Sequence, residues 1–220
     1  MNILTLDARL WSAAKQAGLT RGEVQNIIAD ASSEAAQLLP SQFEFLNIII
    51  GPTLSEWVIP ETGDMGMTYS DEYISITFDA GVPYGAERMK EALRATVFHE
   101  MVHAATFAQD PWQASALFGT VTEGLATVFE RDYANSSPLW ARYEGDVVMQ
   151  KWYDEMKSLP QSEEKNRSYF FEHEDGRKWI VYKTGTWIID KLLASGEDMF
   201  DLMKLDHRTV LDKFEALQRV

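Results

Sequence analysis

Residues 96–105 read TVFHEMVHAA, a run that is almost wholly apolar except for two histidines and one glutamate at its centre. His99 and His103 are four residues apart, so on a helix both imidazoles share one face and can reach the same metal ion. Glu100 lies about 100° round the helix from His99, because an α-helix has about 3.6 residues per turn. It is poorly placed to bind the same ion, but it can reach water beside it. The pattern therefore predicts a metal site with Glu100 as general base.

An ordinary helix without metal is the alternative explanation of this stretch. The chain has four histidines, and an accidental match to the pattern should usually fall on a solvent-facing stripe. Here the other positions leave no polar face, since they are Val97, Phe98, Met101, Val102, Ala104, Ala105 and Phe107. Buried imidazoles and carboxylates are costly unless they are paired or bound to metal. The setting favours a metal site, and a buried helix with satisfied polar groups remains the alternative.

Composition narrows the class of protein. The chain has 220 residues, of which 45% are hydrophobic, so a sizeable core can form. Its net charge of −14 argues against a nucleic-acid partner and against binding to an anionic membrane. There is no cysteine, so His, Asp or Glu must hold any metal. Neither a signal peptide nor an apolar run approaching ~20 residues is evident, and we expect a cytoplasmic protein without a membrane segment. The sequence leaves the oligomeric state open.

Periodicity predicts an α+β fold. Helices are expected within the first forty residues, one of them after a capping box at Thr20 and Glu23. Strands are expected at 43–51 and on either side of a turn at Ser70-Asp71. Helices dominate afterwards, and the expected ranges are 86–109, 120–133, 146–157, 178–194 and one or two short segments from 197 onward.

A catalytic zinc site needs a third protein ligand. One known spacing requires glycine at 106 and histidine at 109, but these residues are Thr106 and Gln109. Glu123 follows His103 by 123 − 103 = 20 residues, which allows a second helix to turn back beside the first. Gly124 would let those two helices approach closely.

Glu123 also has a purely structural interpretation. Thr120 and Glu123 have capping-box spacing, so Glu123 can instead close a helix N-terminus. The rival carboxylates for the third ligand are Asp110, Glu130 and Asp132. The two remaining histidines, His173 and His207, are expected on a solvated loop and at the surface.

HEMVH at 99–103, EGLA at 123–126 and YKTG at 182–185 together resemble the gluzincin metallopeptidases. They resemble most closely a bacterial family described as zinc-dependent proteases and known only as a domain of unknown function. The similarity spans about residues 90–215. It implies one zincin-like domain over 1–220, in which 1–110 supply helices, sheet and active-site helix and 111–220 form a helical part. It further implies a small, mostly antiparallel sheet packed on the HExxH helix.

The resemblance also implies one zinc ion per chain, with His99, His103 and Glu123 as ligands and Glu100 as base. Thermolysin-like members carry an aspartate four residues after the ligand glutamate, where it braces a histidine. Thr127 stands at that position here. The residues that support the ligands must therefore differ in this chain.

The residues and the resemblance together predict a zinc peptidase acting on a peptide or protein substrate. Tyr182 is the candidate donor to the oxyanion, because it matches the tyrosine of the family, although a core aromatic is equally consistent. A substrate would lie extended along a sheet edge, for which YISITFDA at 73–80 is the candidate strand, although this segment can equally form an interior strand. The alternative function is a zinc-binding but non-hydrolytic regulatory or sensor module. The presence of Glu100 speaks against it, because a structural zinc site needs no base.

Overall fold

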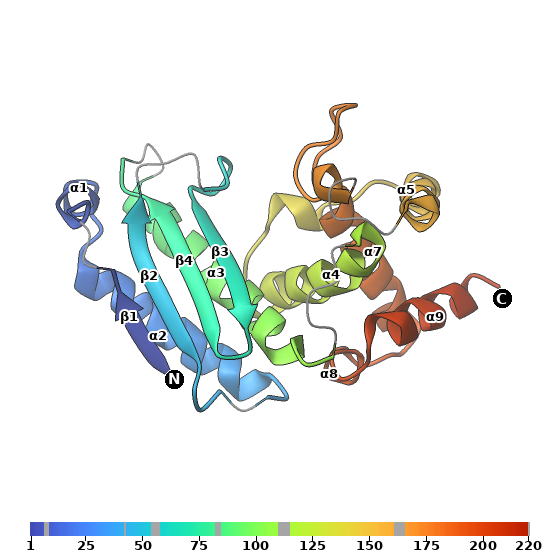
Figure 1. Ribbon diagram of the computed structural model, residues 1–220, viewed down its shortest axis with the longest axis horizontal. Helices are drawn as coiled ribbons and strands as arrows, with labels where there is room; N and C mark the ends of the chain where they lie inside the picture. The colour runs from blue at the N-terminus through green and yellow to red at the C-terminus, as the bar shows by residue number, and fades with distance from the viewer. Residues whose placement is uncertain are drawn as a thin grey trace. The chain divides into compact units, whose positions relative to one another are not determined.

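The computed structural model describes residues 1–6, 9–41, 43–53, 58–81, 85–109, 115–160 and 166–219. Its contacts divide the chain into two compact units (Figure 1). The first comprises Met1–Ala105 with Tyr133–Ser136, and the second comprises Thr106–Asp132 with Ser137–Val220. The first unit holds a sheet with helices, and the described part of the second is helical except for one isolated bridge. The predicted α+β class is confirmed.

The first unit is built on a four-stranded sheet with the order β1-β2-β4-β3. Its strands are β1 (Asn2–Thr5), β2 (Asn47–Thr53), β3 (Asp64–Ser70) and β4 (Tyr73–Asp79). β1 pairs with β2 and β2 with β4 in parallel, whereas β3 and β4 form an antiparallel hairpin. The sheet is therefore mixed, where a mostly antiparallel one was expected. Sequence reasoning missed β1, a four-residue strand too short for its alternation to stand out.

Three helices accompany this sheet: α1 (Trp11–Gln16), α2 (Arg21–Leu38) and α3 (Ala86–Thr106). Parallel strands need a crossover connection, and α1 and α2 supply it between β1 and β2. Figure 1 shows α2 and α3 on the same face of the sheet. The core beneath them includes fully buried side chains of β2 and β4, namely Ile48, Ile50, Ile74, Ile76 and Phe78. Strict alternation of burial along β4 confirms the predicted half-buried strand.

Ion pairs join α2 to α3 at its outer surface. Lys90 lies 3.5 Å from Glu23, and Arg94 lies 2.8 Å from Glu34. The capping box expected at Thr20 and Glu23 is present and begins α2. α3 ends at Thr106 rather than at Gln109, and it carries the His-Glu-His group near its C-terminal end.

The second unit consists of α4 (Ala116–Tyr133, whose last residue belongs to the first unit), α5 (Asp146–Ser158), α7 (Ile180–Ala194), α8 (Met199–Leu202) and α9 (His207–Leu217). Two short 3-10 turns, Leu139–Ala141 and Arg167–Tyr169, lie between them. The predicted helices after residue 110 are confirmed within a few residues, and α4 begins one turn earlier than expected. No helix among the described residues is both long and apolar enough to cross a membrane.

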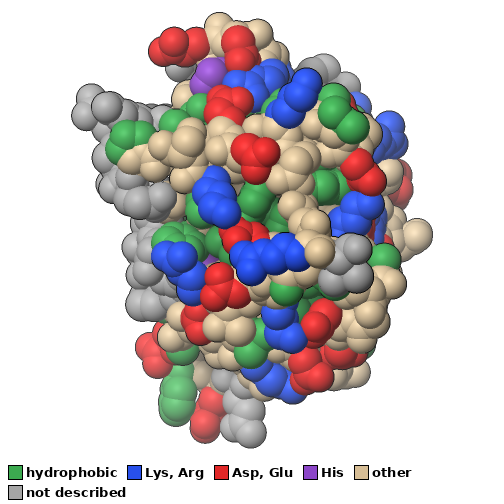
Figure 2. Space-filling model, turned by 90° about the vertical axis from the view of Figure 1, so that its right-hand side faces the viewer, with side chains coloured by type: hydrophobic (Ala, Val, Ile, Leu, Met, Phe, Trp, Pro, Cys, Tyr) green, Lys and Arg blue, Asp and Glu red, His purple; other side chains and the backbone are tan. Residues whose placement is uncertain are grey.

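Charged side chains of both signs are interspersed on the face drawn in Figure 2. Ion pairs of the second unit include Lys191 with Asp146 at 2.7 Å and Lys157 with Glu215 at 2.6 Å. Lysine and arginine side chains thus neutralise part of the excess negative charge in these pairs.

Candidate metal centre

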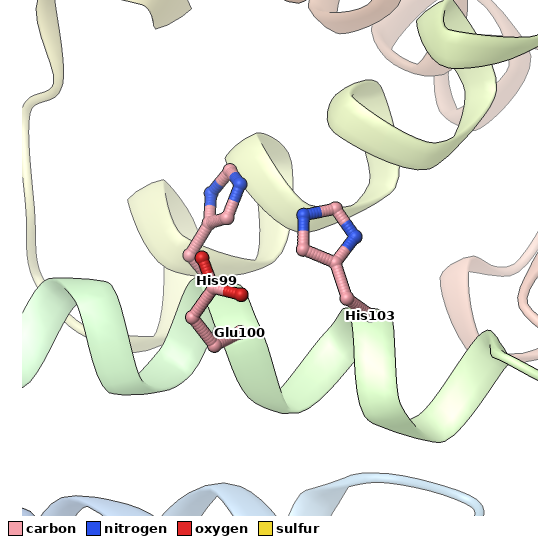
Figure 3. A group of neighbouring side chains, drawn as sticks. All are labelled: His99, Glu100 and His103. Atoms are coloured by element: carbon pink, nitrogen blue, oxygen red, sulfur yellow. The ribbon is translucent and has the colours of Figure 1, made fainter. Parts of the chain in front are cut away.

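α3 brings His99, Glu100 and His103 together, as the HExxH spacing predicts. Figure 3 shows both imidazole rings projecting from the same side of α3, with the Glu100 carboxylate close to them. One ligand atom from each residue can be chosen so that all three lie within 4.8 Å of one another. The two rings meet edge to face, with centroids 4.8 Å apart. The two imidazoles are donors that suit zinc, and the neighbouring Glu100 carboxylate is a group that could accept a proton from water beside the ion.

The helix that carries this group is buried, as its apolar composition predicts. Val97, Phe98, Met101 and Val102 are at most 1% exposed. His99 and Glu100 are also buried, and His103 is half-buried. A packed helix holds the two imidazoles at a fixed separation, which reduces the entropy lost when they bind an ion. Among the described residues this is the one group of metal-ligating side chains so close together.

The buried Glu100 carboxylate is hydrogen-bonded to the sheet. The Thr68 hydroxyl on β3 lies 2.7 Å from Glu100 Oε2 and 3.0 Å from the Glu100 carbonyl oxygen. Gly66, two residues earlier on β3, lies directly against the same side chain, because a Cβ built on Gly66 would collide with Cγ and Oε1 of Glu100.

A second bond joins β3 to α3 in the opposite sense. The Thr96 hydroxyl on α3 donates to Asp64 Oδ2 on β3 at 2.6 Å. Asp64, Gly66 and Thr68 alternate along the strand, so all three face α3. Sequence reasoning did not single them out. The available clue was DMGMT at 64–68, in which a carboxylate, a glycine and a hydroxyl alternate with methionines.

The structure removes one alternative for Glu123. α4 begins at Ala116, so Thr120 and Glu123 lie inside the helix rather than at its start. The Thr120 hydroxyl donates to the Leu117 carbonyl at 2.6 Å. Asn166 Oδ1 accepts instead from the first backbone N–H, that of Ala116, at 3.1 Å. The capping-box interpretation is therefore wrong. Glu123 is half-buried in the second unit, and its role as third ligand remains a prediction.

The rival carboxylates have different surroundings. Asp110 lies outside the described residues. Asp132 is paired with Arg131 at 2.7 Å. Glu130 is buried on α4, two turns beyond Glu123. It therefore remains the residue with which Glu123 should be compared in a test of the third ligand.

Gly124 lies against another glycine of the second unit. A Cβ on Gly124 would meet the backbone of Gly185, and a Cβ on Gly185 would collide with the Thr120 carbonyl oxygen. The close approach that Gly124 permits is thus between α4 and α7, two helices of the second unit. The Arg131 guanidinium strengthens the same pairing, with bonds of 2.9 and 3.0 Å to the Asp190 carboxylate on α7.

Tyr182 lies in the first turn of α7, within a cluster of aromatic rings. Its ring centroid is 5.6 Å from that of Trp179, 6.0 Å from that of Trp140 and 6.5 Å from that of Phe170. Trp179 precedes the helix in a left-handed conformation with φ of 60°. Such a backbone costs about 1–3 kcal/mol in a non-glycine residue and persists only where surrounding packing holds it. This packing fixes the Tyr182 ring, and its role as a donor remains a prediction.

Thr127 and the other two histidines complete the predicted set. Thr127 is fully buried on α4, and its hydroxyl has no hydrogen-bond partner in the part of the chain that is described. Its supporting role remains a prediction. His207 is buried with Nε2 3.0 Å from the Thr122 hydroxyl, so its expected surface position is wrong. His173 is half-buried in a loop, with Nδ1 3.0 Å from Asp175.

The candidate strand for substrate also changes. β4, which contains most of YISITFDA, lies between β2 and β3, so both of its edges are paired. β3 is the terminal strand on that side of the sheet. It is also the strand that contacts Glu100.

Residues 24–212 match the family described as "Predicted Zn-dependent protease (DUF2268)". No curated protein matches the chain. No solved structure matches it either.

Proposed function

Because the chain belongs to the family of predicted Zn-dependent proteases, we propose that it is a zinc-dependent peptidase that hydrolyses peptide bonds. The observation that carries this proposal is the grouping of His99, Glu100 and His103 on one buried helix. A structural zinc site would need only ligands. Here the Glu100 carboxylate lies beside the imidazoles, although it is poorly placed to bind the same ion as His99. It also accepts a hydrogen bond of its own from the Thr68 hydroxyl.

His99 and His103 would hold the ion, with Glu123 as the third ligand. Zinc held there supplies a Lewis acid that makes water more acidic and polarises a substrate carbonyl. Glu100 accepts a proton from the attacking water and passes it to the leaving amine, so that the amine departs neutral. The Tyr182 hydroxyl donates to the oxygen that becomes negative during attack.

A peptide substrate would extend along β3. The strand lies at the end of the sheet, and its inward face contacts Glu100 through Thr68. Main-chain hydrogen bonds to such a strand bind an extended peptide irrespective of its side chains. A substrate bound there would have a peptide carbonyl close to the Glu100 carboxylate.

Metal content and turnover test the proposal together. The protein purified without added metal should contain about one zinc per chain by elemental mass spectrometry. It should cleave casein or a mixed peptide library, stop on addition of a chelator and recover with zinc. Glu100→Gln should keep its zinc and lose about 10²- to 10⁴-fold in kcat.

A matched control is Glu87→Gln, which changes an exposed glutamate of the same helix and should leave turnover unchanged. Equal activity of Glu100→Gln and the parent chain would refute the assignment of the base. One zinc per chain with no cleavage of any peptide would instead support the non-hydrolytic regulatory or sensor module.

A further inference from the structure

We propose that Thr68 is a positioning residue for Glu100. Its hydroxyl holds the Glu100 carboxylate by a hydrogen bond while the Glu100 side chain packs against the Gly66 backbone. The inference rests on the proposed function, in which Glu100 is the base. It adds that β3, the strand proposed to bind the substrate, also orients the Glu100 carboxylate. Thr68 donates the hydrogen bond, Gly66 provides the backbone contact, and Asp64 acts less directly by fixing β3 against α3.

The first step of the argument is the hydroxyl of Thr68. It has one proton and two oxygen atoms of Glu100 within reach, Oε2 at 2.7 Å and the backbone carbonyl at 3.0 Å. A charged acceptor gives the shorter and stronger bond, so the proton points at Oε2. Both residues are buried, where loss of the bond leaves a carboxylate without that donor.

The second step is the glycine. Gly66 does not have a positive φ, so its backbone would accept alanine without strain. What excludes a side chain is Glu100, whose Cγ and Oε1 occupy the space that a Cβ would fill. The carboxylate is therefore held from two directions, by the strand backbone beneath it and by the hydroxyl beside it.

The third step is the position of the strand itself. Asp64 is 1% exposed, and its carboxylate accepts a hydrogen bond from Thr96, four residues before Glu100 on α3. The strand and the helix thus exchange two hydroxyl–carboxylate bonds, one in each direction. This pairing fixes the register of β3 against α3, so Thr68 meets Glu100 rather than a neighbouring residue.

Coupling between the two side chains can be measured without any turnover. The full chain is unfolded with urea in the presence of EDTA, so that zinc affinity does not enter the result. Thr68→Val should raise the unfolding equilibrium constant about tenfold when Glu100 is present. In the Glu100→Ala background the same substitution should change it by less than about twofold, because the bond is already absent.

Activity gives the second readout. Thr68→Val should lower kcat about 10- to 100-fold while KM and zinc content stay close to the parent values. Thr68→Ser keeps the hydroxyl and should recover most of the loss, which a purely structural role in packing would not produce. Gly66→Ala should lower kcat as well, whereas Gly22→Ala, with no atom within 4 Å of the added carbon, should not.

The outcomes separate this inference from the proposed function. Absence of coupling in EDTA overturns the inference, whether or not the chain is a peptidase. If the two residues are coupled but the parent chain has no peptidase activity, the proposed function is refuted. Thr68 is then still the residue that positions Glu100. Coupling in an active chain supports the inference when kcat falls in Thr68→Val and recovers in Thr68→Ser. Three results in an active chain with coupling would overturn the positioning role in catalysis. They are an unchanged kcat in Thr68→Val, a loss of zinc from Thr68→Val, and a kcat of Thr68→Ser as low as that of Thr68→Val.

Discussion

Gly124 of α4 and Gly185 of α7 meet with their backbones in contact, since a Cβ on Gly124 would lie 2.5 Å from the carbonyl carbon of Gly185. This contact gives a physical reason for two of the motifs to occur together. Glu123 directly precedes one glycine, and Tyr182 lies one turn before the other. The crossing of α4 and α7 therefore holds the candidate ligand and the candidate donor on neighbouring helices of one unit.

Gly124→Ala or Gly185→Ala should destabilise the protein, because an added methyl group would force the two helices apart. Overpacking of this kind costs about 1–3 kcal/mol in the free energy of unfolding. Urea unfolding followed by circular dichroism measures it. Gly22→Ala is the control, because it adds a methyl group in open space on α2 and should leave stability equal or slightly higher. An unchanged free energy of unfolding in both test variants would mean that the helices do not meet at these residues.

Glu123→Gln should weaken zinc binding by at least tenfold and leave the fold intact, since the amide is a poor ligand in place of the carboxylate. Competition with a chromogenic chelator measures the affinity. Glu130→Gln is the matched comparison on the same helix, because Glu130 is the buried rival. Equal weakening in the two variants would leave Glu123 without a special role, and weakening confined to Glu130→Gln would move the third ligand there.

Tyr182→Phe should lower kcat by about 10- to 1000-fold with unchanged zinc content, because the change removes one donor to the developing oxyanion. The ring stays in its cluster with Trp140, Trp179 and Phe170, so the melting temperature should change little. Steady-state kinetics on one peptide measures the effect. Turnover equal to that of the parent chain would make Tyr182 a packing residue only.

Stability should depend on pH through Glu155 in the second unit. The Arg177 guanidinium makes two bonds to Glu155, at 2.8 and 2.9 Å, and holds the pKa of that carboxyl below its usual value of 4.5, with the Tyr169 hydroxyl adding to the effect. A lowered pKa in the folded state means that the stabilisation is present above the unfolded pKa. It is lost as the pH falls through the folded pKa.

Arg177→Gln should therefore lower the free energy of unfolding at pH 7 by up to about 1 kcal/mol, and the difference from the parent chain should shrink below pH 4.5. Urea unfolding at pH 7, 5 and 3.5 follows the difference. Lys178→Gln is the control, because its ion pair with Glu172 is exposed at 3.3 Å and should contribute little at any pH. A difference that stays constant down to pH 3.5 would contradict the role of Glu155.

The sequence by itself determined the features that repeat within a few residues. The helical period predicted over 86–109 and the four-residue spacing of His99 and His103 placed both imidazoles on one face, because neighbours on a helix are set by local geometry. Alternation along 73–79 predicted a half-buried strand for the same reason. The capping box at Thr20 and Glu23 was equally local, and it is present.

Only the tertiary structure decided which residues meet across the chain. Thr68 and Glu100 are 32 residues apart, and their bond depends on the order of the strands and on the register of β3 against α3. The same holds for the partner of Gly124, the first residue of α4 and the burial of His207. Each of these results from packing between elements distant in the sequence. The surroundings of the candidate base thus come from the sheet, whereas the positions of the two histidines come from the helix that carries them.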